Sequence, residues 1–177
     1  MSSMHDARVR AASLSLDAAT QAILSFVNAV PESKATEALV GGWTPAGHVW
    51  HVALTNDVFG GILTGRGPIT AAPGISEFTD AEWNFNAPPR ATAPDILLPP
   101  PDADRDVAAR RLRESVTRLR PLIESLDPAL ATQTVQLPWA RVSVYQVVEW
   151  ATGHTLRHLS QVGREMHLSA SRTPVGV

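Results

Sequence analysis

Two histidines four residues apart are the residues of this sequence best placed to do chemistry. His154 and His158 lie in the stretch EWATGHTLRHLSQVGRE, and positions i and i+4 of a helix lie one above the other on the same face. Two imidazoles in that arrangement can hold one metal ion. The pair is not a zincin motif, because Thr155 stands where the HExxH pattern has its glutamate.

A second stretch, GWTPAGHVWHVALTND, supplies candidates for a third ligand. His48 and His51 are three residues apart and both fall on the inward side of an expected helix, so position alone does not decide which would join the site. Three histidines would leave coordination positions open, as catalytic metal sites do. Asp57 lies six residues beyond His51 and off its face, which favours a solvent-facing or cross-helix contact over metal binding.

Composition limits the kind of site and the kind of protein. The chain has 177 residues, 44% of them hydrophobic, and we expect a single domain over residues 1–177 with its own core. It has no cysteine, which excludes disulfides, thiolate metal sites and a cysteine nucleophile. The net charge of −2 argues against a nucleic-acid partner.

The sequence also gives no sign of membrane insertion or export. No apolar run approaches the roughly 18 residues of a membrane span, and the N-terminal residues lack the apolar region of a signal peptide. We therefore expect a soluble, cytoplasmic protein.

Four segments with helical periodicity, and none with sustained strand alternation, predict an all-α four-helix bundle. The expected helices cover residues 13–30, 44–63, 104–127 and 143–166. The second opens with Thr44 as N-cap and Pro45 at the first helical position, and the fourth opens with a capping box of Ser143 and Gln146. Pro121 is expected to kink the last third of the third helix.

A long stretch, residues 64–102, separates the second and third expected helices and holds eight of the 14 prolines. Antiparallel neighbours need only a few linking residues, so this stretch is interpreted as a crossover along the bundle, with a short helical turn near FTDAEWNFN. Its Trp83, Asn84 and Phe85 either line the mouth of a pocket or anchor the loop to the bundle.

The histidine-bearing stretches resemble two signatures of the DinB/YfiT-like superfamily. In GWTPAGHVWHVALTND, a Trp followed by Thr-Pro precedes His51 by eight residues, and VYQVVEWATGHTLRHLSQVGRE resembles the family's last helix with His154 and His158. FTDAEWNFNA is similar to the loop between the second and third helices of the family. The resemblance implies a metal, commonly nickel or zinc, held by His51, His154 and His158, and a homodimer. His48 is a departure, since the family has no ligand there; a hydrogen-bond partner behind the ligands, a pocket acid or base, and polar packing are its open roles.

Three functions are compatible with these residues and this resemblance. The first is a metal-dependent enzyme that activates a low-molecular-weight thiol, such as mycothiol or bacillithiol, for S-transfer or isomerisation of a small-molecule substrate. Arg90, Arg141 and Arg157 are candidates for binding such a charged cosubstrate. The second is a hydrolase of small amides or esters, in which a metal-activated water attacks while His48 or a carboxylate moves protons. The third is a non-enzymatic, metal-stabilised dimer that acts in stress response or ligand sensing.

Overall fold

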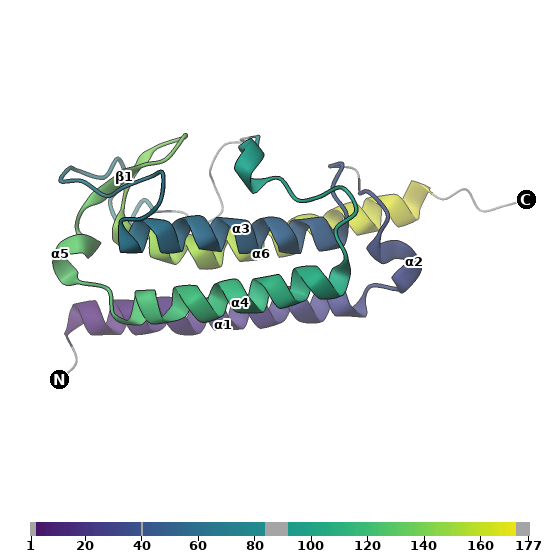
Figure 1. The fold of residues 1–177 in the computed structure, drawn as a ribbon, viewed down its shortest axis with the longest axis horizontal. Helices are drawn as coiled ribbons and strands as arrows, with labels where there is room; N and C mark the ends of the chain where they lie inside the picture. Colours follow the sequence, from purple (N-terminus) through teal and green to yellow (C-terminus); the bar gives the residue numbers. More distant parts are fainter. Residues whose placement is uncertain (1–2, 40, 84–91, 173–177) are drawn as a thin grey trace, which may run out of the picture.

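Four long helices account for most of the chain in the computed structural model, which describes residues 3–39, 41–83 and 92–172, with side chains described up to residue 167 (Figure 1). They are α1 (Met4–Ala29), α3 (Pro45–Thr64), α4 (Arg105–Glu124) and α6 (Val144–Arg172). The shorter elements are α2 (Glu32–Ala35), the 3-10 turn η1 (Asp95–Leu97), α5 (Pro128–Ala131) and the strands β1 (Thr134–Gln136) and β2 (Arg141–Ser143). The chain is therefore mostly helical, as predicted, with a small sheet in addition. Within the described residues, no helix combines the length and the apolar character that crossing a membrane requires.

The four long helices lie in two layers, α1 beside α4 and α3 beside α6 (Figure 1). In Figure 1, α3 and α4 run in one direction, and α1 and α6 run in the opposite one. Because α3 and α4 are parallel, the chain between them returns along the length of the helices.

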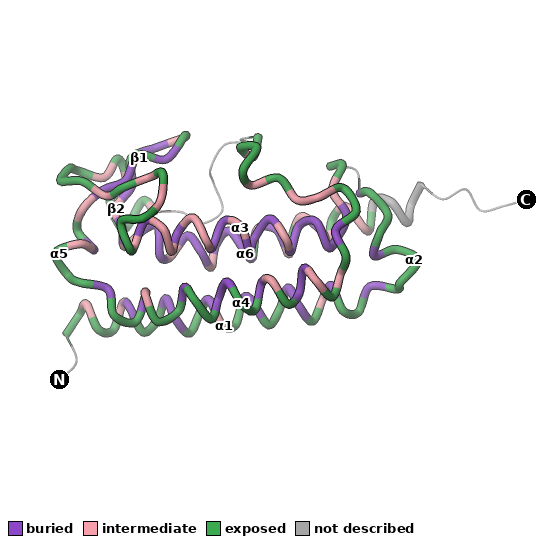
Figure 2. Tube along the Cα trace, viewed as in Figure 1, coloured by how far each residue is buried: buried purple, intermediate pink, exposed green. Residues whose placement is uncertain are grey.

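The layer of α3 and α6 is buried on more sides than the other layer. These helices face α1 and α4 on one side and are partly covered on the other by the crossover and the sheet, whereas α1 and α4 expose a continuous outer face (Figure 2). The aliphatic core between the layers includes Leu16, Ile23, Val49, Leu112 and Leu119, none of which is more than 1% exposed. A polar side chain on the inner faces of α3 or α6 is thus removed from water and needs another partner.

The predicted start signals of α3 and α6 are confirmed. The Thr44 hydroxyl accepts a hydrogen bond from the backbone N–H of Gly47 at 2.9 Å, and Pro45 is the first helical residue. The Ser143 hydroxyl accepts from the Gln146 N–H at 3.2 Å, and the Gln146 side chain accepts from the Ser143 N–H at 3.0 Å. These caps fix where both histidine-bearing helices begin.

Three predicted helix boundaries are wrong. α1 begins at Met4 rather than residue 13, because Ser3 and Asp6 form a capping box that the sparse apolar residues of this turn did not reveal. α4 ends at Glu124 rather than residue 127, since Asp127 caps the separate helix α5. α6 extends beyond residue 166 to Arg172 because no glycine or proline interrupts it there. The kink at Pro121 stays a prediction.

A two-stranded antiparallel sheet precedes α6 and was not predicted. Val135 pairs with Val142, and Ala72 of the crossover forms a further bridge to Thr134 through backbone hydrogen bonds of 2.8 and 2.9 Å. Strands of three residues are too short to show the alternation that marks a strand in a sequence. The bridge ties the crossover to the sheet.

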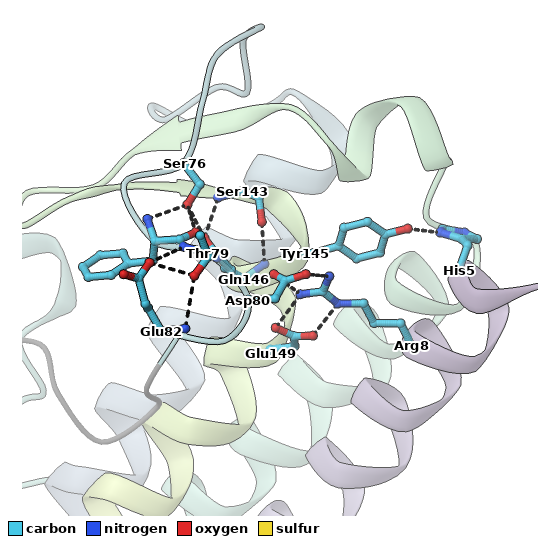
Figure 3. A network of polar contacts seen from close by, with 11 residues as sticks. His5, Arg8, Ser76, Thr79, Asp80, Glu82, Ser143, Tyr145, Gln146 and Glu149 are labelled. Atoms are coloured by element: carbon cyan, nitrogen blue, oxygen red, sulfur yellow. Dashed lines mark hydrogen bonds and ion pairs between the residues drawn. The ribbon is translucent and has the colours of Figure 1, made fainter.

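Polar contacts fasten the first part of the crossover to α1 and α6 (Figure 3). The guanidinium group of Arg8 lies between the carboxylates of Glu149 and Asp80, with 2.7 Å between Arg8 Nη1 and Asp80 Oδ2. The Ser76 hydroxyl donates to the Gln146 side-chain oxygen at 2.6 Å. The crossover is thereby held against the start of α6.

Trp83 ends a hydrogen-bonded turn of the crossover, since its backbone N–H donates to the backbone carbonyl of Thr79 at 3.0 Å. The indole ring stacks on Trp139 with 6.1 Å between centroids and meets Trp150 edge-on at 6.2 Å. These contacts support an anchoring role for Trp83. Asn84 and Phe85 lie outside the described residues.

Candidate metal centre

Four histidines of α3 and α6 meet between these two antiparallel helices. His48 and His51 lie on the first two turns of α3, which Thr44 caps, and His154 and His158 lie one turn apart in the middle of α6. All four are buried, with exposed fractions of 1% for His48, 5% for His51, 8% for His154 and 6% for His158.

Three of the four rings direct a nitrogen at a common point. His154 Nε2 lies 3.2 Å from His51 Nε2 and 3.2 Å from His158 Nε2. One nitrogen from each ring lies within 4.8 Å of the other two, and among the described residues this is the only such group of metal-binding side chains. Three nitrogens at these separations could hold a single metal ion. We call His51, His154 and His158 the histidine triad.

The other ring nitrogens of the triad have different surroundings. His51 Nδ1 lies 2.8 Å from the backbone oxygen of Leu97 in η1, and His158 Nδ1 lies 3.0 Å from His48 Nδ1. His154 Nδ1 is buried and has no hydrogen-bond partner within the described residues. The structure therefore places His48 behind His158, outside the triad.

Two tryptophan rings contact the histidines of the triad. Trp43 contacts His51 with 4.8 Å between ring centroids and His158 with 6.1 Å, and it also meets the edge of His48 at 5.2 Å. The Trp150 ring centroid lies 6.0 Å from that of His154. These rings hold the imidazoles in place and exclude water from part of the site.

Burial keeps these histidines neutral near pH 7. It lowers the pKa of His48 to about 4, although the nearby Glu165 carboxylate acts in the opposite direction. Burial also lowers the pKa of His51, against the hydrogen bond to Leu97, which raises it. The pKa values of His154 and His158 are lowered further, first by burial and then by neighbouring positive charge that includes Arg157. Neutral imidazole is the form that binds a metal.

The donor set fits a transition metal better than magnesium or calcium. All three converging atoms are imidazole nitrogens, and the group includes no carboxylate. Magnesium and calcium prefer oxygen ligands, whereas zinc, nickel, copper and iron accept imidazole.

Other residues considered from the sequence lie elsewhere or remain unplaced. Asp57 pairs with Arg118 of α4 at 2.8 Å, as a cross-helix contact rather than a ligand. Arg141 is exposed on β2, whereas Arg157 lies close enough to the triad to affect its pKa values. Arg90 is outside the described residues.

Two contributors to the site were missed from the sequence. The carbonyl of Leu97 leaves no side-chain signal, so no pattern could have revealed it. Glu165 was detectable, because it lies seven residues after His158 and therefore on the same helix face. Its carboxylate accepts hydrogen bonds of 2.9 Å from the Gly41 N–H and from the Gln161 side chain, which ties the segment before Trp43 to α6.

Comparison with known proteins identifies the family but not an individual relative. No curated protein and no solved structure has a significant match to this chain. A family model described as the DinB superfamily matches residues 15–162, a range that includes the histidine triad and most of the four long helices. This confirms the resemblance seen in the two histidine-bearing stretches. The chain belongs to the DinB superfamily.

Proposed function

We propose that this chain is a metal-dependent enzyme with a four-helix-bundle scaffold, and that His51, His154 and His158 hold one divalent transition metal, zinc or nickel in the first instance. The convergence of three buried, neutral imidazoles carries the proposal. An ion held by neutral ligands keeps its charge and lowers the pKa of a thiol or water that it binds. The rings and their aromatic neighbours orient the donor atoms and limit access of water.

The proposed reaction is the activation of a small thiol for S-transfer or isomerisation of a small electrophile. The chain has no cysteine, so the thiol has to come from a cosubstrate. Arg157 is the candidate for attracting an anionic cosubstrate, because its positive charge helps to lower the pKa of both His154 and His158. Hydrolysis of a small amide or ester, with His48 or a carboxylate as the proton acceptor beside the metal, is the alternative reaction for the same site.

Thermal unfolding of the metal-loaded protein tests the proposed reaction class. Mycothiol, bacillithiol and glutathione are compared with their S-methyl derivatives, which keep the charges but cannot give a thiolate. Stabilisation by one free thiol but not by its S-methyl form supports thiol activation. Equal increases in melting temperature with the free thiol and its S-methyl form, or no increase with either, contradict thiol activation. The hydrolase and the non-enzymatic dimer are then the alternatives. Sedimentation of the same samples tests the expected homodimer.

A further inference from the structure

The four imidazoles form a continuous hydrogen-bonded chain that begins at a backbone carbonyl. Its links are Leu97 O to His51 Nδ1, His51 Nε2 to His154 Nε2, His154 Nε2 to His158 Nε2, and His158 Nδ1 to His48 Nδ1. Each neutral imidazole has one N–H donor and one nitrogen acceptor. The position of one hydrogen therefore constrains the next.

The carbonyl of Leu97 decides the first step because it can only accept. His51 must then carry its hydrogen on Nδ1, which leaves a lone pair on Nε2. His154 Nε2, 3.2 Å away, has to be the donor to that lone pair. His158 Nε2 lies at the same distance from His154 Nε2 and accepts the same hydrogen in a bifurcated bond, so the hydrogen of His158 is on Nδ1.

The opposite assignment for His158 leaves two lone pairs facing each other. With its hydrogen on Nε2, His158 would donate to His154 Nε2, which would then be an acceptor. His154 Nε2 and His51 Nε2 would lie 3.2 Å apart with no hydrogen between them, which is unfavourable for buried acceptors. His48 Nε2 and His154 Nδ1 have no partner among the described residues in either assignment, so these two atoms do not distinguish them.

We propose that His48 is a positioning residue: its Nδ1 accepts the hydrogen of His158 Nδ1 and so keeps the His158 Nε2 lone pair directed at the other two rings of the triad. Leu97 O performs the same task for His51. Two of the three converging nitrogens are then ready to bind a metal, and only His154 has to move its hydrogen from Nε2 to Nδ1. This inference rests on the proposed metal site, and it selects one of the three roles open to His48.

Ring-nitrogen NMR of the metal-free protein tests the assignment directly. Long-range ¹H–¹⁵N spectra of protein with ¹⁵N-labelled histidine distinguish a ring nitrogen that carries hydrogen from one that does not. We expect hydrogen on Nδ1 of His51 and His158, and on Nε2 of His48 and His154. Addition of Zn²⁺ moves the hydrogen of His154 to Nδ1 and leaves that of His48 in place. A His158 ring with its hydrogen on Nε2, or shared evenly between both nitrogens, overturns the proposal.

A matched pair of substitutions at His48 separates the hydrogen bond from packing. His48→Asn keeps an acceptor oxygen near the position of Nδ1, whereas His48→Leu has a similar size and no acceptor. We expect His48→Leu to bind Zn²⁺ 10- to 100-fold more weakly than the parent and to lose the preference of His158 for the Nδ1–H form. His48→Asn retains most of both. Equal Zn²⁺ affinities for the two variants overturn the proposal.

Two controls complete the experiment. His5→Gln changes a histidine at the other end of the molecule, where His5 contacts Tyr145 and the Leu126 carbonyl, and leaves Zn²⁺ affinity unchanged. Unfolding curves show whether each variant is folded. If the parent itself binds no Zn²⁺, the proposed function fails, while the spectrum of the metal-free parent still decides the role of His48.

Discussion

The inward polar side chains in two parts of α6 have different kinds of partner. At the start of the helix, Gln146 and Glu149 each meet a partner of complementary chemistry within the chain, Ser76 and Arg8 respectively (Figure 3). Further along, His154 and His158 face other imidazoles. Polar groups that are matched internally hold a fold together, whereas converging groups of one kind are typical of a ligand site. The first part fastens the crossover, and the second is the candidate metal centre.

Removing a triad nitrogen is expected to have the largest effect on metal binding. His51→Ala, His154→Ala and His158→Ala each lose one of three ligands and should weaken Zn²⁺ or Ni²⁺ binding by more than about 100-fold. Glu149→Gln, from the fastening part of the same helix, should bind as the parent does. Chelator competition measures all four proteins. A Glu149→Gln variant that loses metal as the triad variants do would remove the distinction between the two parts of α6.

Acid should destabilise the metal-free protein through its buried histidines. The folded-state pKa of each of the four histidines is below the unfolded value of about 6.5, so the unfolded chain binds more protons below that pH. Stability of the metal-free protein is therefore complete above about pH 6.5 and falls as pH decreases. With a folded pKa of about 4, His48 alone removes on the order of 3 kcal/mol by that pH.

Urea unfolding between pH 4 and 8 measures this loss, and metal occupancy after dialysis measures the accompanying release. Because the ligand pKa values are lowered, release should have its midpoint below pH 6.5. A free energy of unfolding that does not change between pH 7 and pH 4.5 would contradict the burial of neutral histidines.

Removing the contacts of Arg8 with Glu149 and Asp80 should lower the free energy of unfolding and leave metal affinity unchanged. Arg8→Ala removes a partly buried cation from between Glu149 and Asp80, for an expected loss of about 1–3 kcal/mol. Arg10→Ala, two residues along α1 and exposed, is the matched control and should change stability by less than about 0.5 kcal/mol. Equal stability of the two variants would show that the Arg8 contacts drawn in Figure 3 contribute nothing measurable.

The smallest effect is expected at Asp57. Its contacts with Arg118 and Arg111 join partly exposed side chains, and such pairs contribute under about 1 kcal/mol. Asp57→Asn should therefore unfold almost as the parent does and bind metal with the same affinity. Reduced metal affinity in this variant would mean that Asp57 takes part in the site after all.

The sequence predicted best where one signal is local and strong. The Thr44-Pro45 start, the capping box of Ser143 and Gln146, and the spacing of His154 and His158 all depend on residues within a few positions of one another. The starts of α3 and α6, and hence the meeting of their histidines, could therefore be predicted before the structure was known.

The sequence predicted least where contacts join distant residues through the backbone. The bridge between Ala72 and Thr134 and the bond between His51 and the Leu97 carbonyl involve groups that every residue carries, so no residue type marks them. The contact of His48 with His158 depends on how two helices are rotated about their axes. The sequence could place both histidines on the inner faces of their helices, but it could not show which imidazole contacts which.

Metal stoichiometry of the parent protein tests the central claim most directly. Protein is loaded with Zn²⁺, dialysed at pH 7.5 and analysed for metal and protein together, beside a variant in which all three triad histidines are alanine. One ion per chain in the parent, and none above background in the variant, is the predicted result. No retained metal in the parent, or equal amounts in the two proteins, would contradict a metal centre built from His51, His154 and His158.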